Sequence, residues 1–424
     1  MSTIESLPKG WSEKPLGELL SFQNGANADG SAYGRGVKFA NVLEVLENSH
    51  LKAKQIPGMV SVPKSVIQSF RLIPGDVLFN RTSETQDEVA LASVYLDESE
   101  AIFGGFVIRG RRKTDELDPV WSGYGLRADR VRKQIVALSQ GAVRANIGQE
   151  NLGKVIVWLP PLEEQQAIAG VLSDVDALID SLDALIAKKR DLKQATMQQL
   201  LTGKKRLPGF SRPGKRILTE AGYLPSDWDV QTLGSLTTLM TNGFVGTATS
   251  HYTSSDGVLY IQGYNVKEDG LKFHGIKFVT KAFHAAHMKS CLRGGDLLTV
   301  QTGEVGLSTV VPDEHAGSNC HALIISRFRK SDVDSNFMRY YFNSHIGRSR
   351  LRLIETGTTM KHLNVGDMLQ FVVPVPRLCE QNAIAEVLMD NDAEIKALTA
   401  RRDKTQLMKT GLMQELLSGR RRLV

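Results

Sequence analysis

A long segment in the first half of this chain is repeated at its C-terminal end. Residues 160–207 match residues 376–423 at a constant shift of 216, and about half of the 48 aligned positions are identical. Internal repetition on this scale constrains the fold more than any local motif, because both copies are expected to form the same structural unit. The sequence therefore predicts that the 424 residues form two related halves.

Each copy has the pattern of one long helix. Pro160 and Pro161 precede the first helix, Glu163 and Glu164 lie in its expected first turn, and Gly203 marks its expected end. A helix of about 40 residues is roughly 60 Å long, which is too long to be buried within one compact domain. We therefore expect the two helices to pair as an antiparallel coiled coil, with two independent core helices as the alternative.

Apolar residues at three- and four-residue steps are the expected contacts between the helices. These positions are Leu178, Ile179, Leu182, Leu185, Ile186, Leu192, Ile395 and Leu398. The second helix is more polar, and Arg401, Arg402 and Thr405 fall on its expected inner side.

The repeat continues outside the helices. Residues 7–17 match residues 224–234 around a Leu-Pro pair and a tryptophan, at a shift of 217. Residues 74–79 and 294–299 each place a glycine and an aspartate before a β-prone run, which is typical of a turn entering a strand. Each half therefore carries the same sequence of landmarks.

The segments between these landmarks diverge almost completely. They mix short β-prone runs with a helical piece late in each half, which is typical of an α+β fold. We predict two globular α+β domains in a pseudo-two-fold tandem repeat, separated by two long antiparallel helices. The expected boundaries are residues 1–158 and 224–374 for the domains, 159–207 and 375–424 for the helices, and 208–223 for the linker.

Composition narrows the possible environments and partners. A net charge of +6 and a pI near 9.0 are compatible with a polyanionic partner, although the excess is modest. The cysteines Cys291, Cys320 and Cys379 are scattered, so we expect neither a disulfide framework nor a paired-cysteine metal site. The chain lacks an apolar run of about 20 residues and a signal-peptide pattern, which favours a cytoplasmic protein without a membrane contact.

A second pair of matching loops lies just before the long helices. Residues 140–146 and 356–362 each combine a glycine, small residues and one basic side chain. Such a loop suits close approach of backbone amides and a cation to a phosphate. A turn that enters a β-strand is the alternative interpretation.

In their combination and order, these features resemble the DNA-specificity (S) subunits of type I restriction-modification enzymes. The motifs that carry the resemblance are residues 161–169 (PLEEQQAIA) and 376–385 (PRLCEQNAIA), which lead to QLLTG at 199–203 and ELLSG at 415–419. The resemblance implies two target-recognition domains, each reading one half of a bipartite, asymmetric site in double-stranded DNA. It also implies that the paired helices set the unread spacer, and half-site centres about 10 bp apart would suit such a reader.

The resemblance implies partners as well. Two methyltransferase subunits are expected to dock around the helices, and restriction subunits that translocate DNA are expected to join them. This chain itself is expected to be non-catalytic and to hold no cofactor. S-adenosylmethionine, ATP and Mg²⁺ would be used by the partner subunits.

The expected DNA contacts lie after the two glycine-aspartate turns, in a basic run of the first domain and in the matching loops. They are Arg81, Thr82, Arg109, Arg111, Arg112, Lys113, Arg144, Gln301, Thr302, Thr358, Thr359 and Lys361. These side chains can bind phosphate oxygens or base edges. For each of them a structural turn or a solvated loop is the alternative.

An enzymatic reading finds no site in the sequence. The chain has no phosphate-binding G-x-x-x-x-G-K-[ST] loop and no Asn-Pro-Pro-aromatic motif of adenine methyltransferases. His284, His287 and Cys291 have a metal-like spacing, but the matching positions of the first half hold no ligands, so we do not expect zinc. The alternatives to DNA recognition are a stand-alone DNA methyltransferase or nuclease, and a coiled-coil scaffold that does not read DNA.

Overall fold

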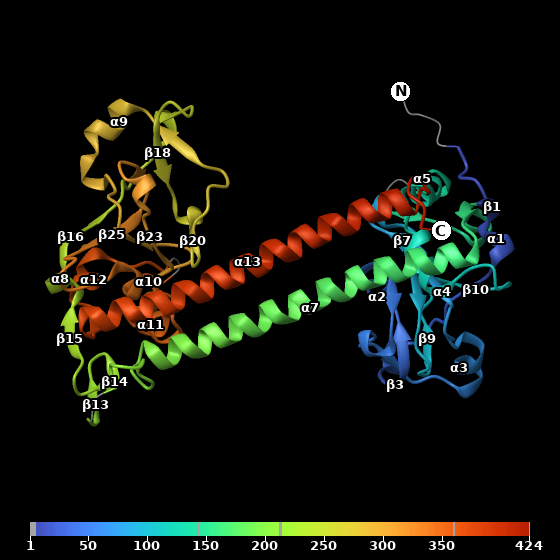
Figure 1. Cartoon of the computed structure of the whole chain (residues 1–424), viewed down its shortest axis with the longest axis horizontal. Helices are drawn as coiled ribbons and strands as arrows, with labels where there is room; N and C mark the ends of the chain where they lie inside the picture. The colour runs from blue at the N-terminus through green and yellow to red at the C-terminus, as the bar shows by residue number, and fades with distance from the viewer. Residues whose placement is uncertain (1–5, 142–143, 212–213, 359–360, 424) are drawn as a thin grey trace. The chain divides into compact units, whose positions relative to one another are not determined.

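The chain divides into two units in the computed structural model, which describes residues 6–141, 144–211, 214–358 and 361–423. Unit 1 contains residues 1–182 and 401–424, and unit 2 contains residues 183–400. Two long helices, α7 (Leu162–Leu200) and α13 (Leu378–Leu416), contribute a part to each unit (Figure 1). The units are described separately below.

Unit 1 is built on a five-stranded sheet in the order β2-β10-β6-β8-β4. Its strands are β2 (Leu20–Asn24), β10 (Val107–Arg112), β6 (Val77–Asn80), β8 (Ala92–Tyr95) and β4 (His50–Leu51). A three-stranded sheet contains β5 (Met59–Val60), β3 (Tyr33–Ala40) and β9 (Ala101–Phe103), while β1 (Ser12–Pro15) pairs with β12 (Ile156–Leu159) and β7 (Thr82–Ser83) with β11 (Ala145–Asn146). The short helices are α1 (Leu16–Leu19), α2 (Val42–Glu47), α3 (Lys64–Phe70), α4 (Pro119–Gly125), α5 (Asp129–Leu138) and α6 (Gln149–Gly153).

Unit 2 has a four-stranded sheet in the order β16-β25-β22-β23. These strands are β16 (Thr237–Asn242), β25 (Leu323–Phe328), β22 (Leu297–Val300) and β23 (Ser308–Val310). A second sheet contains β17 (Tyr252–Thr253), β21 (Lys277–Val279), β18 (Val258–Ile261) and β24 (Asn319–Cys320). Three further pairs of strands are β15 (Asp229–Thr232) with β26 (Val372–Val375), β13 (Arg216–Thr219) with β14 (Gly222–Pro225), and β19 (Val266–Lys267) with β20 (Gly270–Leu271). The short helices are α8 (Leu233–Leu236), α9 (Lys281–Ala286), α10 (Ser335–Asn343), α11 (His345–Leu351) and α12 (Val365–Gln370).

The two units share one arrangement of strands, which we call the frame. The order β2-β10-β6-β8 in unit 1 corresponds to β16-β25-β22-β23 in unit 2. In both units the strand that precedes the long helix pairs antiparallel with an early strand outside this sheet, β12 with β1 and β26 with β15. The registers also match, since Ser12 faces Leu159 in unit 1 and Asp229 faces Val375 in unit 2. The predicted tandem α+β repeat is therefore confirmed.

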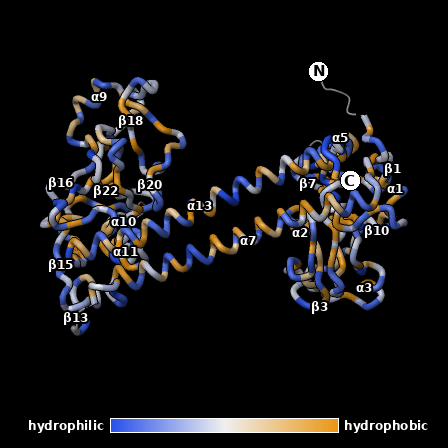
Figure 2. The backbone as a smooth tube through the Cα atoms, viewed as in Figure 1, coloured by the Kyte–Doolittle hydropathy of each residue, from blue (hydrophilic) through white to orange (hydrophobic). Residues whose placement is uncertain are grey.

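The ends of the long helices belong to the hydrophobic cores. In unit 1, Leu172 of α7 and Leu416 of α13 are buried in the same cluster as the sheet residues. In unit 2, Leu388 of α13 and Leu200 of α7 play the same part. Figure 2 shows the apolar residues alternating with polar ones along both helices. Each hydrophobic core therefore includes residues from the start of one long helix and from the end of the other.

Within each unit the two helices run in opposite directions. In unit 2, Lys189 Nζ lies 2.6 Å from a Glu394 carboxylate oxygen, and Lys193 Nζ lies 2.6 Å from Asp392 Oδ1. As the residue number rises on α7 it falls on α13, as the predicted antiparallel pairing requires. In unit 1 the matching ion pair joins Lys409 to Asp176 at 2.5 Å.

The structure corrects the predicted inner stripe of α7. Ile179, Leu182 and Ile186 are buried, but Leu178, Leu185 and Leu192 are 39%, 38% and 51% exposed. The buried positions continue as a heptad pattern through Leu172 and Lys193, one residue beyond each exposed leucine. Leu178, Leu185 and Leu192 were included in the prediction because apolar residues at seven-residue intervals are typical of a coiled-coil contact. The position that is in fact buried at this interval holds Lys193, which the apolar pattern does not reveal.

The second helix is polar on its inner side, as expected. Thr405 is buried and Arg402 is half-buried, whereas Arg401 is exposed. Ile395 and Leu398, which were expected to pair the helices, are half-buried. The middle of the helix pair therefore combines apolar contacts with buried polar groups.

Candidate nucleic-acid interface

Two sequence-predicted segments meet in unit 1. β7 pairs antiparallel with β11, so that Thr82 faces Asn146, and the Ile147 N–H donates to the Arg81 carbonyl oxygen at 3.1 Å. Arg81 and Arg144 are exposed on these neighbouring segments, and Thr82 is half-buried. Arg144 lies 3.6 Å from Glu84 in an exposed ion pair. The structure thus brings Arg81, Thr82 and the Arg144 loop together.

The same two segments meet in unit 2. Thr302 forms an antiparallel bridge with His362, and the Leu363 N–H donates to the Gln301 carbonyl oxygen at 3.1 Å. Lys361 and Thr302 are exposed, and Gln301 is half-buried. Thr358 is exposed on the same loop, whereas Thr359 lies outside the described residues. The paired loops were predicted separately from the turns, and their meeting was not predicted.

A buried aspartate pairs with an arginine at the start of the strand that leads to each meeting point. In unit 1, Asp76 accepts two hydrogen bonds from the Arg111 guanidinium at 2.9 and 2.7 Å, and in unit 2, Asp296 accepts two from Arg327 at 2.8 and 2.7 Å. The hydrogen bond to Asp76 raises the pKa of Arg111, and the bond to Asp296 raises that of Arg327. Each aspartate also caps its own turn by accepting from the backbone N–H three residues earlier. The aspartate of the glycine-aspartate turn is therefore structural.

The predicted basic run of unit 1 is used within the fold. Arg109 is buried and donates to the Arg71 carbonyl oxygen at 3.1 Å and to Gln23, and burial lowers its pKa. Arg112 donates to the Leu117 carbonyl oxygen at 3.2 Å, and Lys113 to that of Gly17 at 2.5 Å. With Arg111 bound to Asp76, all four side chains have internal partners.

This arrangement corrects the expectation that the basic run forms one phosphate-binding surface. Residues 109, 111 and 112 belong to β10, and successive residues of a strand point to opposite faces. Arg109 and Arg111 share a face on which both reach the Arg71 carbonyl oxygen. Cations that are adjacent in the sequence therefore each bind a different partner within unit 1, and they do not form one basic surface.

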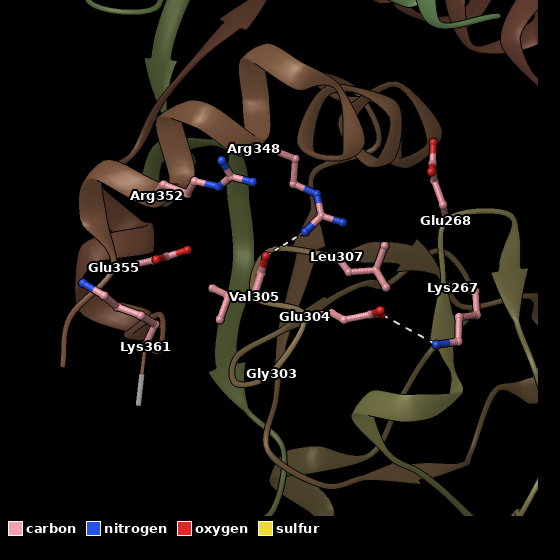
Figure 3. Close-up of a pocket in the computed structure, with 10 residues that line it drawn as sticks. All are labelled: Lys267, Glu268, Gly303, Glu304, Val305, Leu307, Arg348, Arg352, Glu355 and Lys361. Carbon is pink, nitrogen blue, oxygen red and sulfur yellow. Dashed lines mark hydrogen bonds and ion pairs between the residues drawn. The ribbon is translucent and has the colours of Figure 1, made fainter. Parts of the chain in front are cut away.

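A polar cavity of about 690 Å³ lies beside Lys361 in unit 2 (Figure 3). Arg348, Arg352, Lys267 and Lys361 line it together with Glu268, Glu304 and Glu355. Arg348 donates to the Val305 carbonyl oxygen at 2.7 Å, and burial lowers its pKa. Lys267 lies 3.6 Å from Glu304. The cavity therefore offers both cations and carboxylates next to the proposed DNA contacts.

Arg348 and Arg352 were missed in the sequence. They lie four residues apart at the end of α11 and in the 3₁₀ turn Arg352–Ile354, so they share one face of a helical segment. Their spacing is the signal that identifies them as neighbours. Their place beside Lys361 depends on the tertiary fold and has no signal in the sequence.

A metal site is not formed by the described residues. Within the ranges that the structure covers, no group of three or more His, Cys, Asp and Glu side chains has the arrangement to hold a metal ion. The ring of His287 stacks on Phe283, and its Nδ1 lies 2.8 Å from the Phe283 carbonyl oxygen. No helix in those ranges is both long and apolar enough to cross a membrane.

Comparison with known proteins gives one consistent family. The sequence profile described as the type I restriction modification DNA specificity domain matches residues 99–188 and 225–407. A putative type I restriction enzyme MjaX specificity subunit from Methanocaldococcus jannaschii is 24% identical over 424 residues, which cover 99% of this chain and 96% of that protein. The match therefore extends over nearly the full length of both chains.

Solved structures show the same fold. The crystal structure of a type I restriction-modification S subunit from M. genitalium superposes with a TM-score of 0.58 at 14% identity, covering 98% of this chain and 97% of that one. A chain from a structure on complex assembly and conformational transition of a type I R-M system gives a TM-score of 0.57 at 17% identity, covering 97% and 98%. At these identities the likeness supports the fold alone.

Proposed function

This chain belongs to the family of type I restriction modification DNA specificity domains, and we propose that its two units read the two halves of a bipartite DNA site. The paired helices then set the unread spacer between the half-sites. DNA recognition is the role of this chain, and the chemistry on DNA is carried out by other subunits.

The repeated meeting of two segments is the observation that carries this proposal. In both units the residues after the glycine-aspartate turn lie against the loop before the long helix. The backbone arrangement of the two meeting segments is the same in both units, but their side chains differ. Unit 1 has Arg81 and Arg144 on these segments, and unit 2 has Gln301 and Lys361. Arginine prefers guanine edges and glutamine prefers adenine edges, so one frame with unlike side chains suits two unlike half-sites.

Methylation mapping tests this function directly. DNA from cells that carry this chain and its methyltransferase should show methylated adenines within one split sequence motif. Arg81→Ala should relax the sequence preference in one half of the motif, and Gln301→Ala should relax it in the other. A scaffold that does not read DNA predicts no consistent motif, and that result would refute the proposal.

We further propose that this chain has no catalytic role. The sequence has neither a phosphate-binding G-x-x-x-x-G-K-[ST] loop nor the Asn-Pro-Pro-aromatic motif of adenine methyltransferases. In unit 2 the Thr356 hydroxyl lies 3.1 Å from His362 Nε2, but it also accepts a hydrogen bond from Asn364 at 2.9 Å, which suits a contact that closes the loop. S-adenosylmethionine, ATP and Mg²⁺ would accordingly be bound and used by the partner subunits. Purified full-length chain should therefore neither methylate nor cleave DNA when all three are supplied, and turnover by the chain alone would favour the enzymatic alternative.

We propose that methyltransferase subunits dock on the outer side of the long helices. In unit 2, Leu185 and Leu192 of α7 are exposed one heptad apart, which suits contact with an apolar helix of a partner. Leu192→Asp should abolish co-purification with the methyltransferase while leaving the fold intact, and Arg190→Asp, at an exposed position on another face of the same helix, serves as the control. Restriction subunits would join this assembly in the cytoplasm, where its DNA lies.

A further inference from the structure

Phe106 is an aromatic side chain that the fold of unit 1 holds out into solvent. It lies in the turn between β9 and β10 and is 66% exposed, whereas Phe103 at the start of that turn is fully buried. In the described part of unit 1 no other aromatic side chain is as exposed. A single exposed apolar residue is common on protein surfaces, so its significance depends on how it is held and on what surrounds it.

The turn that carries Phe106 is tightly constrained. The Val107 N–H donates to the Gly104 carbonyl oxygen at 2.9 Å and closes the turn. A Cβ atom at Gly104 would lie 2.6 Å from the side-chain oxygen of Asn41, and one at Gly105 would lie 2.0 Å from that of Asn27. A side chain at either position would therefore displace the asparagine that packs against the turn. A side chain held by such a turn loses little backbone freedom when it binds a partner.

Phe106 lies next to the proposed DNA contacts of unit 1. The Arg81 N–H donates to the Phe106 carbonyl oxygen at 2.7 Å, and the Arg81 carbonyl oxygen accepts from the Ile147 N–H at 3.1 Å. The turn of Phe106, the segment of Arg81 and the loop that begins at Arg144 are thus three neighbouring stretches of backbone. Arg81 is therefore the direct neighbour of Phe106, Arg144 lies on the stretch beyond Arg81, and all three side chains are exposed.

The corresponding turn in unit 2 is different. Gly25 donates to the Val107 carbonyl oxygen in unit 1, as Gly243 donates to that of Leu323 in unit 2, which aligns β10 with β25. Ala322 precedes Leu323, and the connection from the preceding strand is one residue shorter than in unit 1. An alanine therefore stands where unit 1 has Phe106, and the half-buried ring of His321 in this connection packs on Phe244 and Tyr260.

We propose that Phe106 stacks on a base of the half-site read by unit 1 and unstacks the duplex there. Proteins that open a base step insert an apolar side chain between the bases and bind the neighbouring phosphates through cations, and base–aromatic stacking is tolerant of sequence. The inference rests on the proposed DNA recognition. It adds that the two half-sites are bound differently, with unstacking at only one of them.

Fluorescence of 2-aminopurine tests the proposal, because this base brightens when it is unstacked. The probe is a duplex with the motif found by methylation mapping, carrying 2-aminopurine in one half-site or the other, and the protein is the full-length chain. Binding should raise the signal several-fold in the half-site of unit 1 and leave the other unchanged. Phe106→Ala should return the signal to that of free duplex and weaken binding roughly 10-fold.

Two further variants separate stacking from other effects. Phe106→Trp keeps an aromatic ring and should retain both the signal and the affinity. Leu43→Ala removes a side chain of matched exposure, 65%, from α2 and should change neither. If the Phe106→Ala chain bound specifically and raised the fluorescence as much as the wild-type chain does, this inference alone would be overturned. Absence of any specific binding by the wild-type chain would overturn the proposed function and this inference with it.

Discussion

Arg144 allows the proposed phosphate contact to be tested at one residue. Its ion pair with Glu84 is 3.6 Å long and both side chains are largely exposed, so the pair contributes little to folding. Arg144→Ala should leave the unfolding midpoint unchanged. DNA binding should weaken, and the slope of log affinity against log salt concentration should become shallower by about 1.

The matched control for this test is Arg190→Ala, which removes an exposed arginine from α7. Affinity and salt slope should be those of the wild-type chain. Binding titrations at four or more salt concentrations measure both quantities. An Arg144→Ala chain with the wild-type salt slope would place the phosphate contact elsewhere.

Asp296 is a residue on which the frame of unit 2 depends. Its side chain is buried, and the Arg327 side chain that binds it is only 19% exposed, so Asp296→Ala leaves a largely buried cation without its carboxylate. The free energy of unfolding should fall by about 3 kcal/mol or more. Asp76→Ala should cost less, because Arg111 in unit 1 is 35% exposed and water can solvate it.

Urea unfolding monitored by circular dichroism measures both changes, and Asp115→Ala, which removes a fully exposed carboxylate, is the control. Equal losses for Asp76→Ala and Asp296→Ala would contradict the argument from exposure.

Sequence patterns showed which single residues lie near the proposed DNA contacts more reliably than they showed what each residue does in the fold. Arg81 and Arg144 were identified from two separate motifs, and the fold brings them to one place. Arg109 and Arg111 were identified as a basic surface, yet they stabilise the fold, because charge in a sequence does not reveal a buried partner. Phe106 passed unnoticed since exposure is a property of the folded chain.

At the scale of elements, a mirrored clamp holds the start of each long helix. In unit 1, Glu164 accepts hydrogen bonds from Trp11 at 2.9 Å and from Arg422 at 2.6 and 2.7 Å. In unit 2, Glu380 accepts from Trp228 at 3.2 Å and from Arg206 at 2.5 and 2.7 Å. The glutamate begins one long helix, and the arginine follows the end of the other. All three side chains recur at matching positions of the two halves, but their contact could not be predicted because the partners lie more than 150 residues apart along the chain.

The clamp of unit 1 should make stability depend on pH. Burial raises the pKa of Glu164, but the hydrogen bonds from Arg422 and Trp11 more than offset it, so the pKa is lowered in the folded chain. A lowered folded-state pKa gives a stabilisation that is present above the unfolded value of about 4.3 and is lost as the pH falls through the folded-state value.

Glu164→Gln should therefore lower the free energy of unfolding at pH 7 by roughly 2 kcal/mol, since hydrogen bonds to a charged group are lost. The difference from the wild-type chain should shrink as the pH falls below about 4. Urea unfolding across pH 3 to pH 7 measures it, with Glu163→Gln, at the exposed neighbouring residue, as control. A difference that stays constant with pH would show that the Glu164 charge does not stabilise the fold.

For the whole molecule, the repeat made most of the architecture predictable. Two copies of a 48-residue pattern required two copies of one unit, and the shared strand order of the two frames meets that requirement. The inner stripe was less predictable, because two of its buried positions hold Lys193, which is paired with Asp392, and Thr405, and a search for leucines passes over them. The strand order within the divergent segments had no repeat to guide it.

The length of the paired helices provides the final test. Inserting seven residues after position 183 of α7 and seven after position 399 of α13 adds one heptad at matching places of the repeat. A heptad adds about 10 Å of helix, which equals about three base-pair steps of duplex DNA. If the paired helices set the spacer, methylation mapping should find the same two half-sites with up to about three more base pairs between them. An insertion in α7 alone displaces its heptad positions from those of α13 and should abolish methylation of the split motif. An unchanged spacer with both insertions in place would contradict a spacer role for the helices.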